Sequence, residues 1–121
     1  MRCMANDWVY YEGKPRRVVM IYKNETVGLE NDGYFDEERI EYVEPIPLTS
    51  EILEKNGFKE SGANGFYTKH RFGCSIKIGY PRFTVSDGLT EEWASARYVH
   101  ELQQMFRLCL MDDDFADNFQ V

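Results

Sequence analysis

The sequence predicts an α+β protein: a small SH3-like N-terminal β segment (residues 1–46), then a helix–three-stranded antiparallel sheet–helix unit (residues 47–121). Three observations favour this class. Short runs rich in β-branched and aromatic residues alternate with turn residues in the first segment. The two prolines of EPIP (44–47) favour extended backbone and mark a linker. Two amphipathic helical patterns then flank three runs of alternating residues.

The N-terminal segment is predicted to form a small curled sheet of five short strands. Gly33 can supply the positive φ of a type I′ hairpin turn, so a strand is expected on each side of it. Five strands in about forty residues favour an SH3-like barrel. At 121 residues the chain suits one domain or two very small ones, and the sequence leaves open whether the segments pack together. The runs with clear strand signals are WVYY (8–11), RRVVMIYK (16–23), TVGLE (26–30) and IEYVEPI (40–46).

The second segment opens with a compact helix, LTSEILEKNGF, whose ends are both signalled locally. Thr49 is the expected N-cap, because its hydroxyl can accept from a backbone N–H of the first turn. Leu48 and Leu53 occupy the positions of a hydrophobic staple. Gly57 is expected to take the left-handed conformation that ends the helix, and Phe58 to fold back on Leu53.

The middle of the second segment is predicted to be a three-stranded antiparallel meander. Its runs 66–72, 74–80 and 82–86 alternate apolar and polar residues, which places the two kinds on opposite faces. The two helices of this segment are expected to pack on one of those faces. The core face is expected to hold Cys74, Ile76, Ile78, Tyr80, Phe83 and Val85, and the opposite face Lys69, Arg71, Lys77 and Arg82.

A long closing helix is expected from about Thr90 or Ser95 to about Leu110. Its apolar residues recur at helical spacing, which is typical of a helix with one buried side. An acidic tail, DDDFADNFQV, follows it, and the sequence does not decide whether this tail is helix or strand. The predicted buried stripe consists of Val99, Leu102, Phe106 and Leu110.

The closing helix contains HELQQ (100–104), which differs by one letter from the HExxH zinc-protease motif. That motif needs histidines at i and i+4, with the glutamate between them as general base. Here Gln104 holds the second position, and an amide is a poor zinc ligand. A site would have to combine His100, Glu101 and His70. We therefore expect His100 to be an ordinary histidine at the margin of the core, and we expect neither a metal nor another cofactor.

The basic face of the meander is the second candidate site. Single-stranded nucleic-acid binders combine basic surfaces with aromatic platforms. The alternative is that these charges simply solvate the open face of a sheet. The net charge of −7 opposes binding to nucleic acid, so this function is possible but disfavoured. The residues that would bind are Lys69, Arg71, Lys77, Arg82 and Tyr67.

Two motifs carry a resemblance to a known family. PIPLTSEILEKNGF (45–58) and YVHELQQMFRLC (98–109), together with Asp7, Trp8 and Val9, resemble a family of small proteins encoded in Bacteroides-type genomes, often in prophage regions. Members share a closing "YVHxLQ" helix, and often carry His or Asn where this chain has Gln104. The resemblance implies a phage or mobile-element origin. It implies no activity, because none is established for the family.

The cysteines, the hydropathy and the absence of catalytic motifs narrow the classes of protein to which this chain can belong. The three cysteines are far apart and form no CxxC, which is typical of reduced thiols in a cytoplasmic protein. The longest apolar run, Val18–Tyr22, is too short to span a membrane. No GxSxG or glycine-rich phosphate loop occurs. The sequence therefore predicts a non-enzymatic accessory or interaction protein of the cytoplasm. Its protein partner and its oligomeric state stay open.

Overall fold

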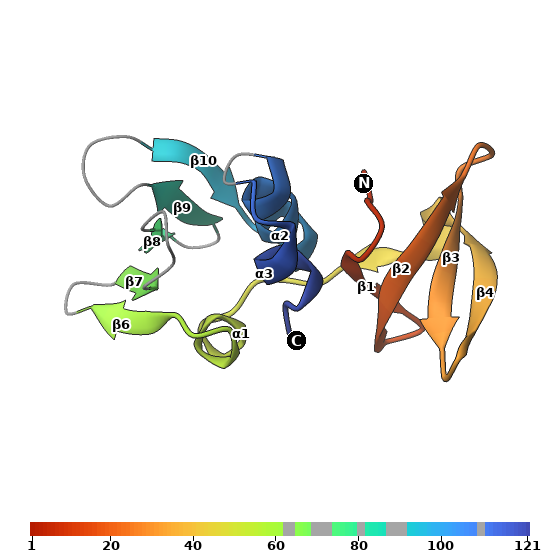
Figure 1. Ribbon diagram of the computed structural model, residues 1–121, viewed down its shortest axis with the longest axis horizontal. Coiled ribbons are helices and arrows are strands. Elements are labelled where there is room, and N and C mark those ends of the chain that lie inside the picture. Colours follow the sequence, from red (N-terminus) through yellow and green to blue (C-terminus); the bar gives the residue numbers. More distant parts are fainter. Residues whose placement is uncertain (62–64, 69–73, 80–81, 87–91, 109–110) are drawn as a thin grey trace. The chain divides into compact units, whose positions relative to one another are not determined.

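The computed structural model describes residues 1–61, 65–68, 74–79, 82–86, 92–108 and 111–121, and it confirms the α+β class (Figure 1). Contacts between Cα atoms divide the chain into two compact units. Unit 1 comprises Met1–Ile46 and Tyr98–Phe119, and unit 2 comprises Pro47–Arg97 and Gln120–Val121. The division after residue 46 lies where the linker was expected. The closing helix, expected in the second segment, instead groups with the first.

Unit 1 contains an antiparallel sheet in the order β4-β3-β2-β1-β5 (Figure 1). The prediction of five strands is confirmed, but the run IEYVEPI is not one strand: Ile40–Tyr42 form a 3-10 helix, η1, before a two-residue strand. Asp32 and Gly33 both have positive φ (46° and 88°), which confirms the predicted hairpin turn. The strands are β1 (Trp8–Tyr11), β2 (Lys14–Tyr22), β3 (Thr26–Asn31), β4 (Tyr34–Arg39) and β5 (Glu44–Pro45).

A β-bulge divides β2 into two parts. Val18 pairs with Leu29, but the next pair is Met20 with Gly28, so Val19 is an extra residue on β2. Such a bulge interrupts the alternation of side chains along the strand. Val18 is fully buried, whereas Val19 and Met20 are exposed. The hydrophobic core of this sheet is formed by Val9, Val18, Val27, Leu29 and Val43.

The closing helix, α2 (Val99–Leu108), is shorter than expected. Residues 92–96 form a strand, so the prediction of a helix from Thr90 or Ser95 is wrong. The helix begins after Tyr98 because the Glu101 carboxylate accepts from the Tyr98 N–H (3.0 Å) and so caps the first turn. The buried stripe is confirmed for Val99, Leu102 and Phe106, which are all fully buried, while Leu110 lies outside the described residues.

The acidic tail contains a short helix, α3 (Asp113–Asp117), within unit 1. Asp112 is its N-cap and accepts from the Phe115 N–H at 3.1 Å. The Phe115 ring stacks on Phe106 with centroids 4.2 Å apart. The choice between helix and strand is thus decided by a local cap and by a contact with α2.

Unit 2 begins with α1 (Ser50–Lys55), whose predicted caps are confirmed. Thr49 Oγ1 accepts from the Ile52 N–H at 3.2 Å. Gly57 has a φ of +85°, and its N–H and that of Phe58 donate to carbonyls of the last turn, each at 3.1 Å. Two such reverse bonds around a left-handed glycine form a Schellman motif.

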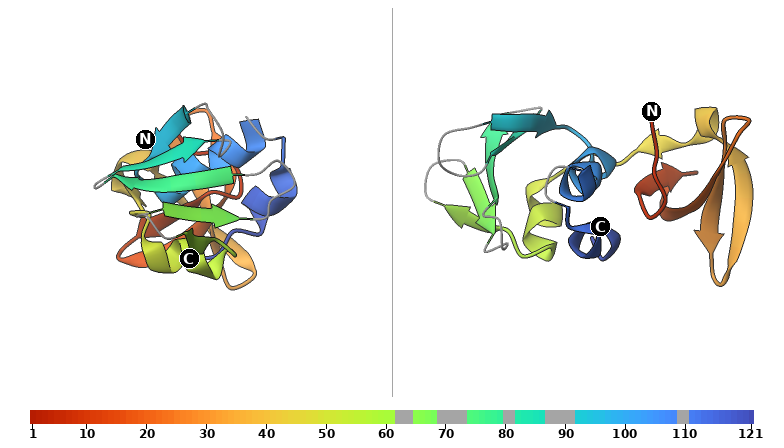
Figure 2. Two further views of the ribbon diagram at one scale, coloured as in Figure 1. Left: turned by 90° about the vertical axis from the view of Figure 1, so that its left-hand side faces the viewer. Right: turned by 45° about the horizontal axis from the view of Figure 1, so that its top comes forward.

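The sheet of unit 2 has five antiparallel strands in the order β10-β9-β8-β7-β6, which lie side by side in Figure 2. The prediction of three strands is therefore wrong, because it omitted the two edge strands, β6 and β10. The register pairs Ile76 with Val85 and Ile78 with Phe83, as the predicted alternation requires. None of the described helices is both long and apolar enough to cross a membrane. The strands are β6 (Lys59–Ser61), β7 (Gly65–Thr68), β8 (Cys74–Gly79), β9 (Arg82–Ser86) and β10 (Glu92–Ala96).

Candidate functional site

Gln103, the first glutamine of α2, is fully buried and hydrogen-bonds to other segments of unit 1. Gln103 Oε1 accepts from the Trp8 N–H at 2.9 Å. Its Nε2 donates to the carbonyls of Asn6 and Ala116, both at 3.0 Å. Because one amide satisfies three backbone groups, it holds the start of β1 and the end of α3 against α2. A buried amide with all its groups bonded is a structural element that periodicity alone does not reveal.

Asp7 is a second buried polar residue that joins separate segments of unit 1. Its Oδ2 accepts from the Met4 N–H (2.7 Å) and from Gln104 Nε2 (2.8 Å). Its Oδ1 pairs with the Arg107 guanidinium, which also donates to Asp117 at 3.3 Å. Asp7 is fully buried and Arg107 is 8% exposed, so each charge compensates the other where water cannot.

The structure places the glutamate of HELQQ at the start of α2 and the histidine in a buried position beside it. Glu101 caps α2 through the Tyr98 N–H. His100 is buried and stacks on the Tyr98 ring at 5.9 Å, and its Nδ1 has no hydrogen-bond partner in the described part of the chain. Burial lowers the pKa of His100, and the nearby Asp7 and Glu101 charges oppose this shift. His70 lies outside the described residues, among which no three His, Cys, Asp or Glu side chains cluster closely enough to hold a metal.

The predicted nucleic-acid face is described only in part. Lys69 and Arg71 lie outside the described residues. Tyr67 pairs with Ser75, two positions before Lys77 on β8, and Arg82 pairs with Gly79, two positions after it. The register therefore gives Tyr67, Lys77 and Arg82 positions of the same parity in the sheet.

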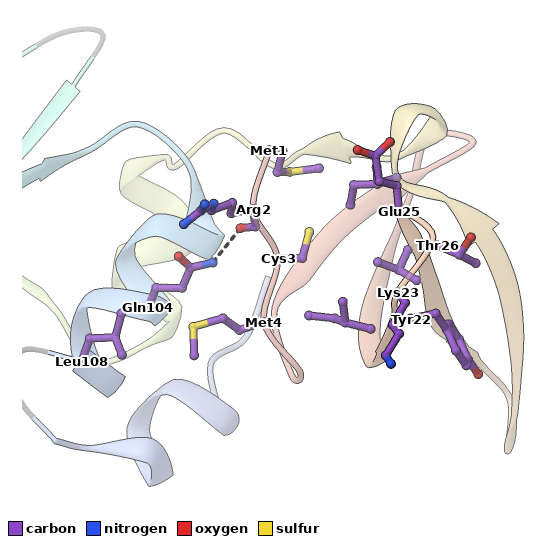
Figure 3. A pocket seen from close by; sticks show the side chains of 13 residues that line it. Met1, Arg2, Cys3, Met4, Tyr22, Lys23, Glu25, Thr26, Gln104 and Leu108 are labelled. Atoms are coloured by element: carbon purple, nitrogen blue, oxygen red, sulfur yellow. Dashed lines mark hydrogen bonds between the residues drawn. The ribbon is translucent and has the colours of Figure 1, made fainter.

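A pocket of about 490 Å³ opens beside the N-terminal residues in unit 1 (Figure 3). The N-terminal residues and α2 are joined there, because Gln104 Nε2 donates to the Arg2 carbonyl at 2.8 Å. Burial, and then the Asp7 charge, raise the pKa of the Cys3 thiol in its wall to about 11, so this thiol is a poor nucleophile at neutral pH. The apolar part of the lining is formed by Met1, Met4, Ile21, Val27, Ile40 and Leu108.

Three apolar side chains gather on the outer face of the sheet in unit 1, and we call Val19, Met20 and Phe35 the outer patch. They converge over Gly28, which has no side chain to separate them. A Cβ built at this position would lie 3.1 Å from Phe35, 3.4 Å from Val19 and 3.5 Å from Met20. The three remain 39%, 47% and 48% exposed. The three side chains therefore form one exposed apolar cluster on this face of the sheet.

The outer patch was missed by sequence reasoning, although a signal was present. The run Val18–Tyr22 contains five consecutive apolar or aromatic residues. In a strand with one buried face, only alternate residues can enter the core. The run therefore indicated either a strand covered on both faces or an exposed apolar surface, and the structure has the second.

Charge is distributed unevenly between the two units. Unit 1 contains seven Lys and Arg against fifteen Asp and Glu, whereas unit 2 contains seven against six. The whole excess of negative charge thus belongs to the unit that carries the outer patch.

Comparison with known proteins found no family model, curated protein or solved structure that matches the chain. The function must therefore be inferred from the residues and their geometry.

Proposed function

We propose that the protein is a non-enzymatic interaction protein, in which a small SH3-like β unit offers the outer patch to a protein partner. The observation that carries the proposal is the convergence of Val19, Met20 and Phe35 over Gly28 while each stays more than a third exposed. Leaving three apolar side chains in water forgoes the stabilisation that their burial would give, about 25 cal/mol for each Å². A partner that covers them would recover it.

The chemistry of the partner follows from the charge of unit 1. With fifteen acidic residues against seven basic ones, this unit attracts basic surfaces and repels acidic ones. The polar groups of HELQQ favour an interaction protein over a hydrolase, because Glu101 caps a helix and Gln104 holds Asp7. The proposed partner is a basic protein with an apolar contact surface.

The proposed origin in a phage or mobile element rests on the resemblance of residues 45–58 and 98–109 to the prophage-encoded family. Two segments on which the resemblance rests also contact each other in unit 1. Asp7 and Trp8 of the opening motif bond to Gln103, Gln104 and Arg107 of the closing helix. Integrase or virion genes beside the gene would support this origin, and a conserved housekeeping operon around it would oppose it.

Capture of partners from a lysate of the source organism tests the proposed function. The immobilised protein is compared with Met20→Lys/Phe35→Lys, which charges the outer patch, and with Tyr42→Lys/Met111→Lys as the matched control. Tyr42 and Met111 are 60% and 75% exposed and lie outside the patch, so the control adds the same charge elsewhere in unit 1. We expect a basic protein that the wild type and the control retain and the patch variant loses. Identical retention by all three would overturn the proposal.

The second candidate function is nucleic-acid binding through the sheet of unit 2. It is favoured by the common parity of Tyr67, Lys77 and Arg82 and by the near-neutral charge of this unit. It is opposed by the net charge of −7 of the whole chain. Binding of labelled oligonucleotides separates it from the first candidate.

A further inference from the structure

β4 is an edge strand with one side of its backbone open. Within the described part of the chain, β3 is its only strand partner. The Ile40 N–H donates to the Glu25 carbonyl at 2.7 Å, which identifies this pair as hydrogen-bonded. Hydrogen-bonded pairs alternate along an antiparallel ladder, so Val27 with Glu38 and Leu29 with Asp36 are the next ones. The residues between them, Phe35, Glu37 and Arg39, direct their backbone N–H and C=O groups away from β3.

The side chains of β4 disfavour pairing with a second copy of the same strand. An antiparallel pair centred on Glu37 would place Glu37 opposite Glu37, and Asp36 opposite Glu38. Like charges directly opposite each other destabilise a sheet. Asp36 is neutralised in part by Arg16 at 3.1 Å, so the remaining negative charge belongs mainly to the two glutamates. The edge therefore resists homotypic pairing in this register, and its net negative charge attracts a basic strand.

The outer patch continues to this edge. Phe35 belongs both to the patch and to the residues whose backbone groups point outward, and it is 48% exposed. Tyr34, beside it, is 80% exposed. A strand added to β4 would extend the sheet and place a side chain next to Phe35, the member of the outer patch that lies on this edge strand.

We propose that β4 is a strand-addition site, at which an extended basic segment of the partner pairs with the outward backbone groups of Phe35, Glu37 and Arg39. This inference rests on the proposed function and specifies how the partner binds. Main-chain hydrogen bonds supply the affinity in such complexes, and the alternating side chains supply the specificity. The preferred segment carries apolar residues on the side of Phe35 and Lys or Arg opposite Asp36 and Glu38.

The probe is a blocked heptapeptide that alternates Val and Lys. Two matched peptides accompany it: one with Glu in place of Lys, and one that keeps Val and Lys but is N-methylated at alternate backbone positions. We expect the Val/Lys peptide to bind and the Glu peptide not to bind. N-methylation should weaken binding on the order of tenfold or more, because it removes donors of the ladder without changing charge. Equal binding of the N-methylated peptide would overturn the proposal.

Amide hydrogen exchange locates the site on the protein. In the free protein, the N–H groups of Asp36 and Glu38 should be protected by β3, and those of Phe35, Glu37 and Arg39 should exchange faster. The Val/Lys peptide should slow exchange at the latter three. Protection elsewhere with none in β4, or no binding at millimolar peptide, would also overturn the proposal.

A proline substitution tests the backbone of β4 directly. Glu37→Pro removes a single outward N–H and leaves the ladder with β3 intact, since proline is tolerated where the N–H of an edge strand faces solvent. Glu37→Gln loses the same charge but keeps the donor, and it is the matched control. We expect the proline variant to lose the peptide and the glutamine variant to retain it. If Glu37→Pro does not fold, the N-methylated peptide decides the same question with the wild-type protein.

The results separate the two proposals. If the Met20→Lys/Phe35→Lys variant loses its partner but the peptide protects no amide of β4, strand addition fails and the interaction function stands. If the patch variant keeps every partner, the interaction function fails whatever the peptide does.

Discussion

Asp7 shows how a single residue can determine the packing of unit 1. The sequence presents it as one acid among twenty-one, beside a tryptophan. The structure buries its carboxylate completely and surrounds it with donors from Met4, Gln104 and Arg107. Residues nearly one hundred positions apart in the chain are thereby joined, and the closing helix becomes part of the N-terminal unit.

Removal of one member of this buried pair should be strongly destabilising. Arg107→Met leaves the Asp7 charge buried with less compensation, and we expect a loss of about 3–5 kcal/mol in the free energy of unfolding. The double variant Asp7→Asn/Arg107→Met removes both charges and should cost less than the sum of the single changes. Urea unfolding of the wild type, Asp7→Asn, Arg107→Met and the double variant completes the cycle. Additive costs would show that the two side chains do not depend on each other.

The lowered pKa of His100 predicts a dependence of stability on pH. Because burial holds its folded-state pKa below 6.5, the unfolded chain binds a proton more readily. The stability associated with burying neutral His100 is fully present at pH values above the pKa of His100 in the unfolded chain. It is lost as the pH falls from about 6.5 towards the pKa of His100 in the folded protein, by at most about 1.4 kcal/mol per pH unit. His100→Gln should remove this part of the slope.

Unfolding in urea at pH 7.5 and at pH 5.5 measures the effect of His100. The wild type should lose more stability between these values than His100→Gln does. An equal loss in the two proteins, or a gain in the wild type, would contradict the burial of a neutral imidazole.

At the scale of elements, α2 is a helix whose two sides perform different tasks. Its apolar stripe, which includes Leu102 and Phe106, follows helical spacing and was predictable. Its polar residues Gln103 and Arg107 are just as buried, and no spacing rule marks them. Hydrophobic periodicity counts apolar residues, so it cannot identify a buried amide whose partners lie far away in the chain.

Two leucines of α2 provide a matched test of its burial. Leu102 is fully buried and Leu108 is 64% exposed. Leu102→Ala should lower the free energy of unfolding by about 2–5 kcal/mol, because it loses transfer energy and leaves a cavity. Leu108→Ala removes the same atoms from an exposed position and should change stability by less than about 0.5 kcal/mol. Similar denaturant midpoints for the two variants would place the stripe on the wrong side of the helix.

The edge strands show where element prediction failed. Thr90 followed by Glu91 and Glu92 favoured the start of a helix just before residues 92–96 (EWASA). The structure pairs them with β9, with Ser95 opposite Thr84 and Ala96 opposite Phe83. A short strand at a sheet edge gains its stability from the partner strand rather than from its own residues, so tertiary pairing overrides local propensity.

At the scale of the whole molecule, charge separates the two candidate functions. The net charge is −7, and unit 1 accounts for all of the excess. Nucleic acid is repelled by that charge, most strongly at low salt where screening is weakest. We therefore expect no measurable binding of mixed single-stranded DNA or RNA at physiological salt.

Fluorescence anisotropy with short labelled oligonucleotides checks this prediction. If the basic face of unit 2 did bind, four phosphate contacts would give a slope of roughly −3 in a plot of log affinity against log salt. Low-micromolar binding that weakens with salt and vanishes in Lys77→Glu/Arg82→Glu would favour the nucleic-acid function over the interaction function.

Features that are controlled by neighbouring residues could be predicted from the sequence. The caps of α1 at Thr49 and Gly57, the turn at Gly33 and the buried stripe of α2 follow from side-chain and backbone preferences within a few positions. These local rules were enough to predict the α+β class and five strands in the first segment.

Which elements pack together and which surfaces stay exposed could not be predicted from local sequence patterns. Gln103 bonds to Trp8 across 95 residues, and this bond helps to assign α2 to unit 1. The bulge at Val19 and the absence of a side chain at Gly28 produce the outer patch. Such features depend on bonds and packing between distant residues, whose energies appear only when the chain has folded and water has left the groups they join.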